Sequence, residues 1–270
     1  MAVDDRSGAM TIHLRCATIA MQGTRPLYDR KNLARLLEVL ETNGVAPATF
    51  GFDERGGDPY TRDAALALLD EPPNPFEQTD LILRRSGSGK YFAMIALWDD
   101  AFVLFRFDAK QRPGMWPRIF AIADSIADLF EPDWGAVGLD IELREPTQKF
   151  ATDDERDTYL MSEAIDLSPK DYNRHGPHGL AMRTYIGPFF AEQLGRERVE
   201  TLPLGVEKLA WGGYRVDLVP EPWTADVPPL LAAWRGGMAH LRDANVLAVP
   251  SMTPTYAQWS RGTSVKLRGE

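Results

Sequence analysis

Cysteine is almost missing from this sequence. Cys16 is the only cysteine among 270 residues. An intramolecular disulfide is therefore excluded, and so is a zinc site built on several cysteines. Cys16 lies in the run 11–19, which alternates in the manner of a half-buried strand. We expect its side chain to be a small part of the core, because free cysteine is among the most buried residue types.

Long hydrophobic runs are missing as well. Residues 1–8 are polar and acidic, without the basic start and apolar stretch of a signal peptide. The longest apolar runs, such as 119–126, are interrupted by Asp124 and fall far short of the ~20 residues that cross a bilayer. We therefore expect a cytoplasmic protein that makes no use of a membrane.

Positive charge is in deficit. Thirty lysines and arginines stand against 39 acidic residues, which gives a net charge of −9 and a pI of about 5.1. Such a surface repels nucleic acid, whose binding depends on lysine and arginine contacts to phosphate. It attracts basic proteins and speeds their encounter. The charge therefore argues against a nucleic-acid partner and suits a basic protein partner, although the solubility of an ordinary cytoplasmic protein explains it equally well.

Hydrophobic residues make up 44% of the chain and charged residues 26%, as in ordinary globular proteins. The first half shows a helix pattern after Asp29 and a short strand at 49–52. A second short helix follows Thr61, and then an antiparallel meander at 81–84, 91–97 and 102–107. A long amphipathic helix at 116–130 and a strand at 136–143 follow.

The second half repeats this rhythm. After a proline-rich and charged connection with one or two short helices, the patterns predict a strand at 180–186 and a helix at 188–194. A hairpin over 206–219, a helix at 227–241 and a final strand at 246–249 come next. We therefore predict an α+β protein of two ferredoxin-like (β-α-β-β-α-β) halves with antiparallel sheets and helices packed on one face. The expected boundaries are 1–145, a connecting segment at 146–178, and 179–270, or one compact domain overall.

No catalytic motif is complete in this sequence. Residues 86–90 (Ser-Gly-Ser-Gly-Lys) lack the first glycine of a phosphate-binding loop and precede a strand, where that loop requires a helix. No serine lies in G-x-S-x-G. Asp140 and Glu142 share one face of their strand and could form a carboxylate pair, although a solvated strand face explains them as well.

His175 and His178 are the best metal-ligand candidates. Two histidines three residues apart could share an ion or supply a general base. A zinc site needs at least a third ligand, and no recognised spacing connects the nearby Asp166 and Asp171 to them. A polar loop with capping histidines is the competing interpretation, and it is the one we favour. His13 and His240 are expected to be structural or exposed.

Two stretches of glycine, proline and aromatic residues resemble a known family. One runs from Phe102 through the long helix to 130–135 (Phe-Glu-Pro-Asp-Trp-Gly). The other includes 185–187, 202–203 and 211–216 (Trp-Gly-Gly-Tyr-Arg-Val), followed by Pro222, Trp223 and the helix with Trp234. Together they are similar to the immunity protein 52 family of bacterial polymorphic-toxin and type VI secretion systems. The resemblance implies a cytoplasmic antitoxin that binds and blocks a cognate effector, and it assigns no site residues.

The resulting expectation is an immunity protein that neutralises a toxin by direct contact, without a catalytic residue, a resident metal or a cofactor. Trp223 and Trp259 are candidate anchors for the partner. One alternative is a hydrolase or metal-dependent enzyme that uses His175 and His178. Another is a module that binds a small ligand or serves as a scaffold. The expected contact residues are acidic: Asp99, Asp100, Asp153, Asp154, Glu155 and Asp157.

Overall fold

The structure, a computed structural model, describes residues 13–53, 57–70, 79–98, 101–108, 114–142, 150, 152–253 and 256–267. Of residues 13–16 and 139–142 it describes the backbone alone. The elements in chain order are β1 (His13–Gln22), α1 (Arg30–Thr42), β2 (Thr49–Gly51), β3 (Asp58–Pro59), α2 (Arg62–Ala67), β4 (Asp80–Arg85), β5 (Tyr91–Ala96), β6 (Phe102–Asp108), α3 (Met115–Phe130), β7 (Trp134–Glu142), α4 (Asp153–Glu163), α5 (Pro169–His175), β8 (Arg183–Ile186), α6 (Pro188–Leu194), α7 (Arg196–Glu200), β9 (Gly205–Lys208), β10 (Tyr214–Asp217), the 3₁₀ turn η1 (Pro222–Thr224), α8 (Val227–Arg242), β11 (Val249–Met252) and β12 (Ala257–Ser260).

The local predictions for the first half are confirmed. Asp29 caps α1, because its carboxylate accepts hydrogen bonds from the backbone N–H groups of Lys31 and Asn32 at 2.8 and 3.2 Å. Thr61 caps α2 in the same way, accepting from the N–H of Ala64. The meander is β4, β5 and β6, paired antiparallel in that order, and the long amphipathic helix is α3. Short-range patterns therefore sufficed for these elements.

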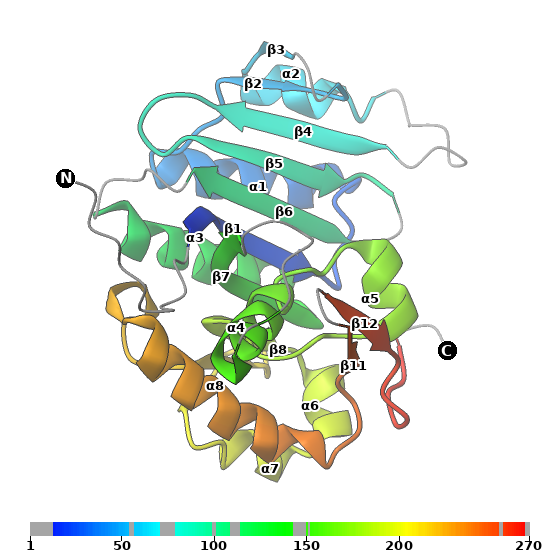
Figure 1. The fold of residues 1–270 in the computed structure, drawn as a ribbon. Helices are drawn as coiled ribbons and strands as arrows, with labels where there is room; N and C mark the ends of the chain where they lie inside the picture. Colours follow the sequence, from blue (N-terminus) through cyan, green and yellow to red (C-terminus); the bar gives the residue numbers. More distant parts are fainter. Residues whose placement is uncertain are drawn as a thin grey trace, which may run out of the picture.

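One sheet runs through both halves of the chain. It has ten strands in the order β3-β2-β4-β5-β6-β1-β7-β8-β10-β9, and every neighbouring pair is antiparallel. The halves meet where β7 pairs with β8, with Trp134 opposite Ile186 and Val137 opposite Arg183. The α+β class is therefore confirmed. The prediction of two separate ferredoxin-like halves is not confirmed, because the strands of both halves share one hydrogen-bonded sheet (Figure 1).

The second half departs from the expected unit at its last strand. β8, β10 and β9 lie in the order of a ferredoxin-like unit, but β7 of the first half occupies the place of the fourth strand. The predicted final strand at 246–249 is wrong. Residues 246–248 are a buried connection, and Val249 begins β11, which pairs with β12 in a separate hairpin. The sequence pattern had not indicated β12.

Helices cover both faces of the sheet. Ile186 lies opposite Trp134, whose ring contacts Phe190 of α6 with 5.8 Å between centroids. Tyr185, the next residue of β8, points to the other face and donates a hydrogen bond to Asp124 of α3 at 2.6 Å. Therefore α3 and α6 lie on opposite faces, and the expected one-faced arrangement is wrong for the whole sheet. In Figure 1, α1 and α3 lie behind the sheet, and α4 and α8 lie in front.

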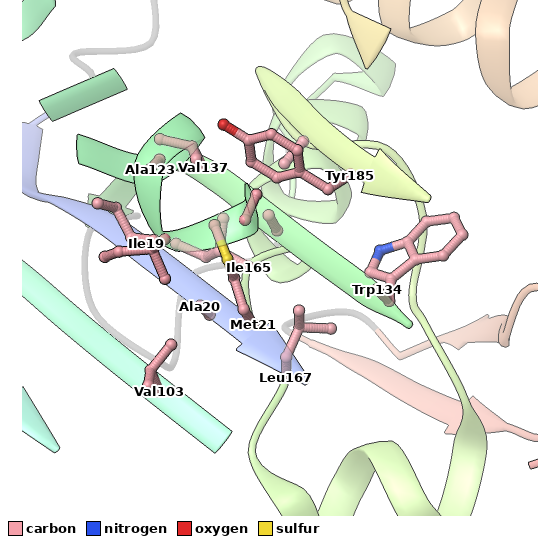
Figure 2. Packing of buried hydrophobic residues seen from close by; sticks show 14 of the residues in the cluster. Ile19, Ala20, Met21, Val103, Ala123, Trp134, Val137, Ile165, Leu167 and Tyr185 are labelled. Carbon is pink, nitrogen blue, oxygen red and sulfur yellow. The ribbon is translucent and has the colours of Figure 1, made fainter. Parts of the chain in front are cut away.

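The hydrophobic core is continuous across the junction of the halves. Figure 2 shows Met21 of β1, Trp134 of β7 and Tyr185 of β8 in one cluster, with Leu167 from the segment between α4 and α5. Gln22 is buried beside them and donates from Nε2 to the carbonyl of Leu167 at 2.8 Å, which satisfies its amide. No helix in the described part of the chain is long and apolar enough to span a bilayer.

Candidate functional site

A pocket of about 340 Å³ lies between α4, α8 and β11. Its floor is apolar, and arginines surround it. The lining residues are Arg156, Asp157, Leu160, Trp234, Arg235, Met238, Arg242, Pro250 and Met252. Three elements that are distant in the sequence therefore meet at one surface.

Helix α8 contributes one face of the pocket. Trp234, Met238 and Arg242 are spaced four residues apart, so they line one side of the helix. The Trp234 side chain is buried, and its indole N–H has no hydrogen-bond acceptor among the described residues. Gly237 allows α8 to pack closely against Leu180 and Leu204, because a Cβ at this position would lie 2.7 Å from a methyl group of each.

Helix α4 contributes the acidic residues that the sequence singled out. Thr152 caps the helix, and the first turn contains Asp153, Asp154 and Glu155, where negative charge is favourable. Asp157 follows one turn later, with a side chain only 13% exposed. Of the predicted contact residues in this stretch, Asp157 belongs to the pocket lining, and the other three precede it in the first turn of α4.

Arginines of this same chain neutralise three of these carboxylates. Arg235 of α8 donates to Asp157 at 2.7 Å and to Asp154 at 2.6 Å. Arg156 donates to Asp153 at 2.9 Å and to Asp157 at 3.0 Å. The hydrogen bonds that Arg235 donates to Asp154 and Asp157 raise its pKa, so this guanidinium stays charged. The ion pairs of Arg235 connect α4 to α8.

Arg242 differs from the other two arginines of the pocket. It is exposed in the last turn of α8, where its charge suits the carboxyl end of the helix dipole. No carboxylate of the described residues is within ion-pair distance of it. The lining therefore contains three arginines and one aspartate, and the guanidinium of Arg242 remains available.

The hairpin β11–β12 closes the pocket from the third side. Pro250 and Met252 alternate along β11 and face the pocket, while Val249 lies on the opposite face and is 49% exposed. Tyr256, just before β12, is 48% exposed. Two large hydrophobic side chains of this hairpin region are thus open to solvent.

Of His175 and His178, the metal-ligand candidates, His178 packs against the β11–β12 hairpin. The ring of His178 stacks on Trp259 of β12 with 4.0 Å between centroids and 7° between planes. Its Nδ1 lies 3.2 Å from the carbonyl oxygen of Glu163, and burial lowers the pKa of the imidazole. His175 lies 6.4 Å from His178 between ring centroids. Among the described residues, no group of three His, Cys, Asp or Glu side chains could hold a metal ion.

The carboxylates near these histidines have local partners. Asp166 accepts from the backbone N–H of Ser168, and Asp171 accepts from its hydroxyl at 2.9 Å. They order the turn into α5. His178 and Trp259 thus attach the hairpin to the segment before β8, which fits the loop interpretation of the sequence. His240 lies on α8, with Nε2 2.9 Å from the carbonyl of Arg198.

The remaining sequence candidates are dispersed. Asp99 and Asp100 lie outside the described residues. The side chains of Cys16, Asp140, Glu142 and His13 do as well, although their backbones pair in β1 and β7. Trp223 is partly buried and packs on Phe120 at 4.9 Å between centroids. Trp259, the other expected anchor, is also partly buried and stacks on His178.

Sequence reasoning missed one further polar cluster. Arg183 of β8 is almost fully buried and donates to Asp217 at 2.6 Å and to Asp124 of α3 at 3.0 Å. Burial and the neighbouring Asp124 carboxylate raise the pKa of the Tyr185 hydroxyl. This cluster connects α3 of the first half to β8 and β10 of the second. The sequence signal was only an arginine and a tyrosine alternating on a short strand.

Comparison with known proteins adds little to this geometry. The sequence matches no protein-family model and no curated protein, so the resemblance to immunity protein 52 gains no support from a family match. Among solved structures, the Pseudomonas aeruginosa T6SS protein PA0821 is similar with a TM-score of 0.49 and 12% sequence identity. The likeness covers 82% of this chain and 76% of that one. At these values it carries no argument about fold or function.

Proposed function

We propose that this protein binds a partner protein and blocks it, as an immunity protein neutralises a cognate toxin. The surface formed by α4, α8 and the β11–β12 hairpin is the proposed contact region. The observation that carries the proposal is the pocket between these elements, with its apolar floor and with Arg242, which forms no ion pair within the described part of the chain. Buried, pocket-filling contacts of this kind contribute most of the energy at protein interfaces.

Two further features support this surface. The ion pairs of Arg235 with Asp154 and Asp157 fix α4 against α8, so the pocket is preorganised and little ordering entropy is lost on binding. The exposed Val249 and Tyr256 add apolar area on the β11–β12 hairpin. The aromatic and glycine pattern that resembles immunity protein 52 points to the same kind of role.

The experiment is co-expression with a candidate toxin, chosen from genes that adjoin the one for this chain, in cells that the toxin kills. We expect the full chain to restore growth and to co-purify with the toxin. Met238→Glu places a charge in the apolar floor and should weaken both effects, while Arg35→Glu, an exposed position on α1 remote from the pocket, should leave them unchanged. Absence of both rescue and complex would refute the proposal.

A small-ligand-binding module remains the second candidate, for one reason. The volume of about 340 Å³ lies at the lower end of the range of small-molecule pockets, about 300–1,000 Å³. A thermal-shift screen of small carboxylates separates this function from the first. A large upward shift that Met238→Glu removes, together with failure of the toxin rescue, would favour the ligand-binding module.

A further inference from the structure

We propose that the pocket between α4, α8 and β11 receives an acidic side chain with an apolar neighbour from the partner protein. This inference rests on the proposed function and specifies the chemistry of the contact. It runs against the expectation from net charge, since a chain with a charge of −9 is expected to recognise a basic partner. The argument depends on which charges of the pocket are already used.

Two arginines already neutralise the carboxylate in the lining. Asp157 accepts from Arg156 at Oδ1, at 3.0 and 3.1 Å, and from Arg235 at Oδ2, at 2.7 Å. Both oxygens therefore have a charged donor, and the side chain is only 13% exposed. A lysine or arginine of a partner would approach this carboxylate against the positive charge of Arg156 and Arg235. A basic side chain is consequently disfavoured in the pocket.

The donors, by contrast, are not exhausted. Arg242 has no carboxylate partner among the described residues, and its guanidinium offers several N–H groups in a planar fork. The indole N–H of Trp234 is enclosed by the protein, so the donor that an incoming group can reach is Arg242, which is exposed. A guanidinium binds a carboxylate more strongly than it binds a neutral acceptor. Arg242 therefore favours an anionic group.

The floor of the pocket requires an apolar group beside that anion. Leu160, Met238 and Met252 line it together with Pro250 and the ring of Trp234. Methionine side chains adapt to the shape of an inserted group. A volume of about 340 Å³ accommodates one or two side chains and excludes a whole helix. An acidic residue next to an aliphatic one in an exposed segment satisfies the charge, the donors and the floor together.

Blocked dipeptides test this chemistry without the toxin. The probes are acetyl-Leu-Glu-amide, acetyl-Leu-Gln-amide and acetyl-Leu-Lys-amide, which share the apolar group and differ in charge. Binding is followed through the indole ¹⁵N–¹H resonance of Trp234, assigned by its loss in Trp234→Phe. We expect the glutamate peptide to shift this resonance saturably, with at least tenfold higher affinity than the other two.

Variants of Arg242 separate charge from fold. Arg242→Glu should weaken binding of the glutamate peptide at least tenfold, Arg242→Lys should retain most of it, and Arg35→Glu should have no effect. Equal binding of the three peptides, no binding by any of them, or an unchanged affinity in Arg242→Glu would overturn the inference. Thermal unfolding of each variant shows whether it is folded at the temperature of the titration.

The two proposals fail separately. If the peptides rank as expected but the toxin is neither bound nor neutralised, the immunity function is lost and the pocket chemistry stands. If the chain neutralises the toxin but does not distinguish the peptides, the partner binds elsewhere on the surface and only this inference is lost.

Discussion

Two adjacent glycines in α8 provide a matched test of how this helix packs. Gly236 is exposed, and a Cβ added there meets no heavy atom within 4 Å. Glycine inside a helix is about 1 kcal/mol less favourable than alanine, so Gly236→Ala should stabilise the protein by about 1 kcal/mol. In a chain of this size that corresponds to a rise in Tm of about 2 °C.

Gly237→Ala should bring the same gain in helix propensity, but the added methyl group would enter space that other side chains already fill. Its Cβ would lie 2.7 Å from methyl groups of Leu180 and Leu204, well inside normal contact distance. Overpacking of this kind costs about 1–3 kcal/mol, so the net effect should be a loss of up to about 2 kcal/mol. The two variants should therefore differ by about 1–3 kcal/mol, a difference from which helix propensity cancels.

The assay is urea denaturation followed by far-ultraviolet circular dichroism, comparing midpoints at equal slopes. Gly236→Ala should raise the midpoint, and Gly237→Ala should lower it or leave it near that of the parent. If Gly237→Ala stabilised the protein as much as Gly236→Ala, α8 would not lie against Leu180 and Leu204, and the position of the pocket wall would be wrong.

Three other perturbations test the junction of the halves and the histidine contact. Phe190→Ala removes the ring that packs on Trp134 and should cost about 3–5 kcal/mol, with hydrogen exchange accelerating in both halves. Exchange that accelerates in the second half alone would speak against a shared core. Arg183→Met leaves the carboxylate of Asp124 without its main cation and should cost about 3 kcal/mol, while Arg183→Lys should cost less. Because burial lowers the pKa of His178, the unfolded chain binds more protons at mildly acidic pH, so stability should fall as the pH drops below about 6.5. His178→Gln should flatten that part of the stability–pH curve, and an unchanged curve would show that this imidazole is not responsible.

Local structure followed from the sequence wherever the information lies within one element. The cap at Asp29, the cap at Thr61 and the spacing of apolar residues in α3 each depend on neighbours within a few positions. The turn 86–90 was correctly assigned to a hairpin for the same reason. The class of the protein follows from the order of such elements.

The sequence could not predict which residues form ion pairs with the acidic residues of α4. Asp154 and Asp157 appeared as a charged stretch free to contact a basic protein. Their actual partner, Arg235, is about 80 residues away, and no local pattern associates the two helices. The spacing of Trp234 and Arg242 on one side of α8 was visible in the sequence, but what faces that side was not.

The sequence by itself determined the helices, the meander and the deficit of positive charge, because these depend on residue type and short spacing. Only the tertiary structure decided that the halves share one sheet, since pairing of β7 with β8 joins residues about 50 positions apart. It also decided which charges remain unpaired. Net charge is a sum over the whole chain, whereas the proposed recognition depends on the few groups, such as Arg242, that have no ion-pair partner among the described residues.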